Sequence, residues 1–307
     1  MSRMYEALKK AQQHGIAIEL LKVVEPTRLE PQLPPWEEPP GTSTPSHFAS
    51  GQDSHRAIAD ESLKNSKGNC IRHLPLQIPE RSVVLPWGGT DGHGGEQYRI
   101  IRTRIVQHPK KPRLIVVSSA GSGDGKTVSA INIAGVLSLR DNANVLLIDG
   151  DFRRAGVSSL LGLPAEPGLA NTLSGSCTLQ EAIIRVEQFP NLYILPAGAG
   201  NANPAELLDT AQWKSLCSTV RERFSFVIID GPPIAAVADY ELIQASCDGV
   251  IVVVRPEHTD RTLFNKAFEL IPEGKKVGVV LNCAYEWFLW KTHESYYYNG
   301  SHGKQAK

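Results

Sequence analysis

Six short apolar runs between residues 114 and 281 constrain the fold of this chain more than any other feature. They are rich in Val, Ile and Leu and do not alternate with polar residues: 114–117, 145–148, 192–195, 226–229, 250–254 and 277–281. Such runs suit parallel strands that are covered on both faces of a sheet. Helical segments are expected between them, one with Asn203 as its N-cap and Pro204 at its first position. The sequence therefore predicts a doubly wound, mainly parallel α/β sheet.

The loop after the first run is rich in glycine and ends in Gly-Lys-Thr, with Ala120 in place of the first glycine of the strict pattern. In such a loop the backbone N–H groups surround phosphate oxygens, the lysine reaches the β- and γ-phosphates, and the hydroxyl ligates Mg²⁺. The helix that follows directs its positive end at the phosphates. We expect Mg-ATP to be bound by Gly121, Ser122, Gly123, Asp124, Gly125, Lys126, Thr127 and Val128.

Aspartates follow two further runs. Asp149 and Asp151 come at the end of the second run, and Asp230 comes at the end of the fourth. In open α/β sheets this carboxyl edge is where ligands bind. Asp230 has the position of a Walker B carboxylate for Mg²⁺. Of the first pair, one aspartate could lie near Mg²⁺ and the other could accept a proton from an attacking hydroxyl. A single aspartate after a strand is usually a helix cap, but three in this order predict phosphoryl chemistry.

Two features lie outside this set. Glu96, Arg99 and Arg102 fall on one face of a predicted helix. That face could be a solvated one with weak ion pairs, or it could contact a neighbouring subunit. Residues 296–298 are three tyrosines in a polar tail, and taken alone they are better explained as a chance cluster than as a functional one.

The regions around the folded core have different compositions. Residues 1–24 show helical spacing of a narrow apolar face, which predicts an amphipathic helix that is either solvated or a docking segment. Residues 25–95 are Pro-rich and lack periodicity, which predicts a disordered linker with one strand-like patch at 82–85. We expect the folded domain to span residues 96–286 and a flexible tail to span residues 287–307.

Composition excludes several other classes. The 32 basic and 32 acidic residues balance, so a broad face for nucleic acid or anionic lipid is not expected. The five cysteines form no Cys-x-x-Cys pair, which argues against a disulfide framework or zinc site and favours a reducing compartment. No apolar run approaches the roughly 20 residues of a membrane span, and the first residues lack the pattern of a signal peptide. A cytoplasmic location is expected.

With these motifs in order, the chain resembles the bacterial tyrosine autokinases (BY-kinases) of capsule and exopolysaccharide synthesis, the CpsD/CapB family. The resemblance covers roughly residues 96–298. It rests on the P-loop at 120–127, the Walker A′ element at 149–153, the Asp-x-Pro-Pro element at 230–233, and Glu-x-x-Arg-x-x-Arg at 96–102. It implies a P-loop NTPase fold of the MinD/ParA-like class.

The resemblance also implies an activity and residue roles. Members use ATP and Mg²⁺ to phosphorylate, in trans and within a ring of subunits, a cluster of C-terminal tyrosines. The implied roles here are phosphate binding by Lys126, Mg²⁺ binding by Thr127, Asp151 and Asp230, proton acceptance by Asp149, phosphate acceptance by Tyr296, Tyr297 and Tyr298, and ring assembly by Glu96, Arg99 and Arg102. Asn282, at the end of the last strand, would contact adenine.

Partners follow from the same resemblance. It implies activation by the cytoplasmic end of a Wzz-like membrane adaptor that controls polysaccharide chain length, and hence recruitment to the inner face of the plasma membrane. A cognate tyrosine phosphatase and no nucleic acid are expected. The aromatic patch at 287–290 is expected to pack on the core.

Two alternatives remain open at the level of the sequence. A partitioning or cell-positioning ATPase of the ParA/MinD kind would carry a second lysine early in the P-loop, where this chain has Gly121. A non-catalytic ATP-binding regulator would keep the nucleotide site and the assembly face but have no kinase output.

Overall fold

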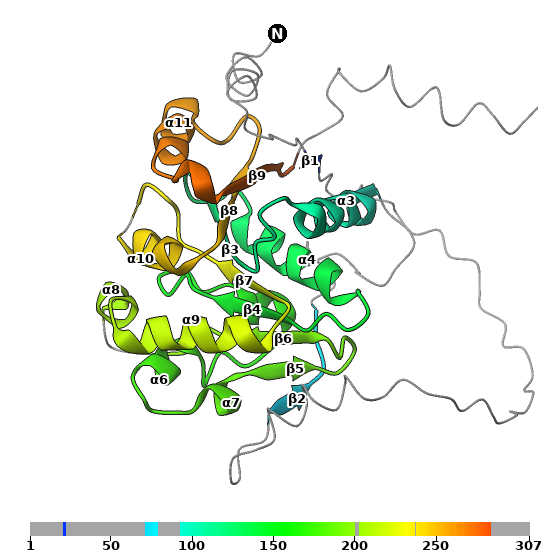
Figure 1. The fold of residues 1–307 in the computed structure, drawn as a ribbon, viewed down its shortest axis with the longest axis vertical. Helices are drawn as coiled ribbons and strands as arrows, with labels where there is room; N and C mark the ends of the chain where they lie inside the picture. The colour runs from blue at the N-terminus through cyan, green and yellow to red at the C-terminus, as the bar shows by residue number, and fades with distance from the viewer. Residues whose placement is uncertain (1–20, 23–70, 79–92, 200–202, 237, 284–307) are drawn as a thin grey trace, which may run out of the picture.

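A single twisted sheet organises the molecule, and helices cover both of its faces (Figure 1). The structure is a computed structural model that describes residues 21–22, 71–78, 93–199, 203–236 and 238–283. Within these residues the sheet has nine strands in the order β1-β9-β8-β3-β7-β4-β6-β5-β2. In chain order they are β1 (Leu21–Lys22), β2 (Arg72–Leu74), β3 (Leu114–Ser119), β4 (Val145–Asp149), β5 (Ile184–Val186), β6 (Leu192–Leu195), β7 (Phe226–Asp230), β8 (Gly249–Val254) and β9 (Lys276–Leu281).

The mainly parallel sheet that the sequence predicts is confirmed. Among the described strands, β5 and β6 form the one antiparallel pair, and the other neighbours run parallel. Each of the six apolar runs became a strand. Along β3, Leu114 and Val116 pack into the core on one face, while Ile115 and Val117 pack into the core on the other. Because both faces are buried, the run needs no polar alternation.

The helices divide between these two cores. Residues of α3 (His93–Gln107), α4 (Lys126–Ser138) and α5 (Val157–Leu161) pack on one face of the sheet. The other face is covered by residues of α6 (Leu169–Leu173), α7 (Leu179–Ala182), α8 (Pro204–Leu208), α9 (Ala211–Arg223), α10 (Asp239–Ser246) and α11 (Arg261–Glu269). A short 3₁₀ turn, η1 (Glu273–Lys275), leads into β9. At α8 the predicted cap is confirmed, with Asn203 accepting from the N–H of Ala205 and Pro204 in the first turn.

Two short edge strands lie where the sequence predicts no strand. Arg72–Leu74 falls in the range predicted as linker but pairs in parallel with β5. Its Arg72 guanidinium donates to the carbonyls of Glu166, Pro167 and Ala182. At the opposite edge, Leu21–Lys22 falls in the range predicted as helix but pairs with β9. For these residues the linker and helix predictions are wrong, because strands of two or three residues carry no periodic signal and depend on partners distant in sequence.

Candidate active site

The register of the central strands brings the predicted aspartates to one edge of the sheet. Asp149 at the end of β4 is the direct neighbour of Asp230 at the end of β7. Asp230 also lies opposite Val117 of β3, just before the P-loop. Because parallel strands end at the same edge, the loops after β3, β4 and β7 meet there.

The P-loop depends on glycine at two positions. Gly123 and Gly125 have φ angles of 87° and 90°, in the left-handed region that glycine adopts without strain. Gly125 is also the N-cap of α4. A Cβ atom there would come within 1.9 Å of Asn282 Nδ2. A side chain at Gly125 would therefore displace Asn282 as well as strain the turn.

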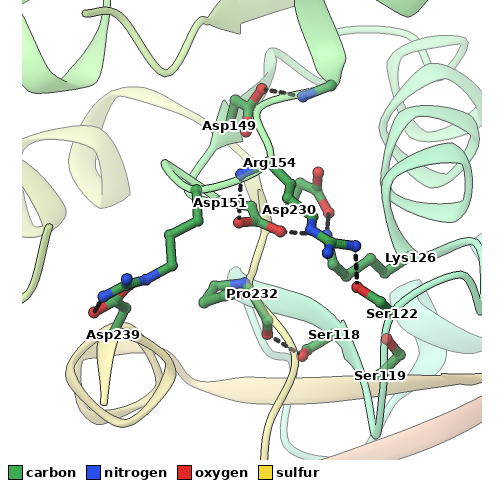
Figure 2. A network of polar contacts seen from close by, with 12 residues as sticks. Ser118, Ser119, Ser122, Lys126, Asp149, Asp151, Arg154, Asp230, Pro232 and Asp239 are labelled. Atoms are coloured by element: carbon green, nitrogen blue, oxygen red, sulfur yellow. Dashed lines mark hydrogen bonds and ion pairs between the residues drawn. The ribbon is translucent and has the colours of Figure 1, made fainter. Parts of the chain in front are cut away.

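Lys126 extends from the first turn of α4 into the aspartate cluster (Figure 2). Its Nζ lies 2.6 Å from Asp151 Oδ2 and 3.9 Å from Asp230 Oδ1. Burial alone would lower the pKa of Lys126, but the charges of Asp230, Asp151 and Asp149 raise it. The lysine is therefore a fixed positive charge at the place where phosphates are predicted to bind.

The two other aspartates have a different electrostatic balance. Burial raises the pKa of Asp230 to about 7, against the opposing charge of Lys126. Burial also raises the pKa of Asp149 to about 6, against backbone hydrogen bonds that lower it. Asp149 Oδ2 accepts from the N–H groups of Gly156 and Val157 at 3.2 and 3.1 Å. Asp149 thus faces the start of α5, whereas Asp151 and Asp230 face Lys126 (Figure 2).

The cluster fits a divalent cation. Neither oxygen of Asp230 has a hydrogen-bond partner within the described residues, although the side chain is fully buried. Oδ1 of Asp149 is also buried and has no hydrogen-bond partner within the described residues. The described residues hold no group of three or more His, Cys, Asp or Glu side chains arranged to bind a metal by themselves. The unpartnered oxygens of Asp230 and Asp149 suit Mg²⁺, which is usually held by one or two carboxylates together with water and substrate phosphates.

The side chain of Asp124 holds the P-loop in place through buried hydrogen bonds, which the sequence does not predict. Asp124, whose side chain is 1% exposed, accepts from Thr259 Oγ1 at 2.7 Å and from the N–H of Gly121 at 3.3 Å. Its Oδ1 also lies 3.1 Å from His258 Nδ1. Thr259 and His258 follow β8, and this position after a central strand is the one feature of the sequence that places them near the site. The sequence predicts Asp124 only as one of the phosphate-binding residues.

Asn282 lies against the same loop. Its Nδ2 donates to the carbonyl oxygen of Asp124 at 3.0 Å, and its own N–H donates to Val254 of β8 at 2.8 Å. Asn282 therefore links the end of β9 to the P-loop. The predicted contact with adenine stays a prediction.

The residues predicted for ring assembly lie along α3. Glu96 and Arg99 form an ion pair of 3.0 Å along α3. Arg102 Nη1 is 3.4 Å from the carbonyl oxygen of Val136 in the same chain. The tyrosines at 296–298 and the aromatic patch at 287–290 fall outside the described residues, as do most of the N-terminal helix and linker. None of the described helices is long and apolar enough to cross a membrane.

The strand, glycine loop and helix, with carboxylates at the ends of two neighbouring strands, define a P-loop nucleotide-binding protein. A family model described as an AAA domain matches residues 112–273, just over half of the chain.

Similarity to known proteins shows which P-loop proteins this chain is related to. Tyrosine-protein kinase CpsD of Streptococcus agalactiae is 31% identical over 216 residues, which cover 69% of this chain and 90% of the relative. The chimerical protein CapA2B2 aligns with a TM-score of 0.62 at 29% identity, over 74% of this chain and 98% of the other. The VpsO kinase domain aligns with a TM-score of 0.54 at 31% identity, over 61% and 93%. The chain belongs to the family of bacterial tyrosine-protein kinases that includes CpsD.

Proposed function

We propose that this chain is an ATP-dependent protein-tyrosine autokinase that regulates exopolysaccharide or capsule polymerisation and export. One observation carries the chemistry: Lys126 lies 2.6 Å from Asp151 and 3.9 Å from Asp230 at the base of a glycine-rich loop. Membership of the CpsD family supports a tyrosine kinase over the ParA/MinD alternative, and so does Gly121 at the place of that class's second lysine.

Binding of ATP rearranges an existing ion pair. In the structure, the charge of Lys126 is matched by Asp151. The phosphates are stronger partners for Lys126, because they bring more negative charge to the same amino group. As Lys126 turns to them, the Asp151 carboxylate is released into the cluster beside Asp230.

The residues then divide the work of phosphoryl transfer. Thr127, Asp151 and Asp230 would hold Mg²⁺, which when bound neutralises charge on the phosphates. Asp149 accepts the proton of the attacking tyrosine hydroxyl. Its pKa of about 6 leaves it mostly ionised at neutral pH, and more basic than an exposed aspartate. Tyr296, Tyr297 and Tyr298 of a second copy supply the acceptor hydroxyls.

Assembly and location complete the proposal. Glu96, Arg99 and Arg102, which lie along α3, would contact the next subunit in a homo-oligomeric ring. A Wzz-like adaptor would recruit the cytoplasmic kinase to the inner face of the plasma membrane, and a cognate phosphatase would reset the tyrosines. The chain would then comprise a helical arm before β1, a linker within 25–95 that is interrupted by β2, the kinase domain to residue 286 and an acceptor tail at 287–307.

The test is phosphotyrosine on the purified full-length chain with Mg-ATP and the cytoplasmic tail of a Wzz-like adaptor. Lys126→Met should abolish the label, and Phe at positions 296–298 should remove most of it while ATP still binds. A chain that binds ATP but carries no phosphotyrosine with any adaptor tail would instead be the non-catalytic regulator. Intact-protein mass spectrometry gives the number of phosphates per chain.

A further inference from the structure

Two consecutive arginines follow the aspartates after β4, and their side chains take different partners. Arg153 Nε donates to Asp239 Oδ2 at 2.8 Å, and Nη2 donates to Oδ1 at 3.4 Å. The Asp239 side chain is only 3% exposed, so Arg153 neutralises a buried carboxylate of α10. Arg154 instead reaches across to the P-loop, where Nη1 donates to Ser122 Oγ at 2.8 Å.

The backbone of Arg154 is fixed close to the phosphate-binding lysine. Its N–H donates to Asp151 Oδ1 at 3.1 Å and to the Asp151 carbonyl at 3.0 Å. The other oxygen of that carboxylate pairs with Lys126. The turn also packs on the end of the P-loop, because a Cβ at Gly156 would lie 3.3 Å from Thr127 Cγ2. The side chain of Arg154 is exposed and can change its partner while the backbone keeps these contacts.

The partner of Arg154 is a weak one. Ser122 and Arg154 are both exposed, and a neutral hydroxyl holds a guanidinium less strongly than an anion does. A phosphate offers two or more oxygens to the planar fork of the guanidinium, which binds such groups in a bidentate manner. A polyphosphate seated in the P-loop would therefore displace Ser122 as the partner of Arg154.

We propose that Arg154 exchanges Ser122 for the terminal phosphate of ATP and so makes the site prefer ATP over ADP. This inference rests on the proposed use of ATP, but it is independent of tyrosine as the acceptor. An arginine supplied by the same chain neutralises charge on a transferred phosphoryl group, as in other P-loop enzymes. Arg153 cannot take this role while it is paired with Asp239.

The experiment compares the affinity of the full-length chain for ADP and for the non-hydrolysable β,γ-imido analogue of ATP, by calorimetry with Mg²⁺. A charge-assisted bond to phosphate predicts that Arg154→Gln weakens the ATP analogue about 10- to 100-fold and ADP by less than about 3-fold. Arg154→Lys should recover part of the loss.

Arg153→Gln is the matched control. It should lower the thermal unfolding midpoint, because Asp239 stays buried without its partner, yet leave the ratio of the two affinities unchanged. Equal losses for both nucleotides in Arg154→Gln would overturn the inference, as would no loss for either. If Arg154→Gln does not fold without nucleotide, the ratio in Arg154→Lys decides. If Arg154→Gln changes the ratio of the two affinities but the wild-type chain carries no phosphotyrosine, the role of Arg154 is supported and the proposed kinase function is refuted. If the wild-type chain carries phosphotyrosine but Arg154→Gln leaves the ratio unchanged, the kinase function is supported and the role of Arg154 is refuted.

Discussion

Two buried aspartates in one site, Asp124 and Asp230, differ in their hydrogen-bond partners. Asp124 in the P-loop accepts hydrogen bonds from Gly121 and Thr259 and also contacts His258. Asp230 at the end of β7 has no hydrogen-bond partner within the described residues, and its nearest cation, Lys126, is 3.9 Å away. Both are almost completely inaccessible to solvent.

The difference separates a structural carboxylate from one kept for a ligand. A buried carboxylate with several donors is compensated, and it fixes the loops that supply the donors. A buried carboxylate without donors costs stability until a cation or a proton arrives. The P-loop is therefore held in shape before nucleotide binds, whereas the aspartate cluster is completed only by its ligands. Substitutions at the two positions should have opposite effects on the stability of the nucleotide-free protein.

The largest effect is expected for Asp230→Asn. Loss of the charge should reduce the phosphorylation rate by about 100-fold or more, on the scale of removing one electrostatic stabiliser from an active site. The same change should raise the unfolding midpoint of the nucleotide-free protein by a few degrees, because it removes a buried charge whose nearest cation, Lys126, is 3.9 Å away. Rate assays and calorimetric melting measure the two effects. A lower midpoint without nucleotide would contradict the idea that Asp230 is strained.

Asp124→Ala should act in the opposite direction on stability. It leaves Thr259 and the N–H of Gly121 without their acceptor, which predicts a loss of about 2–4 kcal/mol of unfolding free energy. Nucleotide affinity should fall together with stability, because the P-loop loses its support. Denaturant unfolding with and without Mg-ATP measures both quantities. Unchanged stability would mean that the contacts of Asp124 do not hold the loop.

The pH dependence of stability should separate the two carboxylates further. Burial raises the pKa of Asp230 to about 7 and that of Asp149 to about 6. Between about pH 4 and pH 7 the folded state therefore holds protons that the unfolded chain has released, so stability falls as pH rises through this window. Asp230→Asn should remove about 2–4 kcal/mol of that fall. Unfolding free energies at pH 5 and pH 7.5, compared between the two proteins without nucleotide, test the sign. A wild-type slope equal to that of Asp230→Asn would contradict it.

The smallest effect is expected for Thr259→Val, which preserves shape and removes one hydroxyl. Asp124 would keep its other contacts, so the predicted cost is about 1 kcal/mol of unfolding free energy with little change in phosphorylation rate. Denaturant unfolding measures the cost, and the Asp124→Ala variant sets the upper bound. A loss as large as that of Asp124→Ala would assign the whole support to the Thr259 hydroxyl, which also accepts from the N–H of Arg255.

The strands and the motif order could be predicted because they are local patterns. Runs of β-branched residues mark buried strands, and a glycine-rich turn between such a run and a helix marks a phosphate loop. Asp149 and Asp230 could be assigned to one edge without coordinates, since parallel strands end together. Sequence therefore determined six strands of the sheet, the P-loop and the identity of Lys126 and the three aspartates.

Other features needed the tertiary structure. Several contacts join residues more than a hundred positions apart. They are the pairing of Arg72–Leu74 with β5, the contacts of His258 and Thr259 with Asp124, and the link from Asn282 to the P-loop. Arg153 and Arg154 are identical neighbours in the sequence, so their different partners could not be predicted from it. The physical reason is that a backbone conformation is favoured by neighbouring residues, whereas the partner of a side chain depends on how distant strands are ordered and how their loops pack.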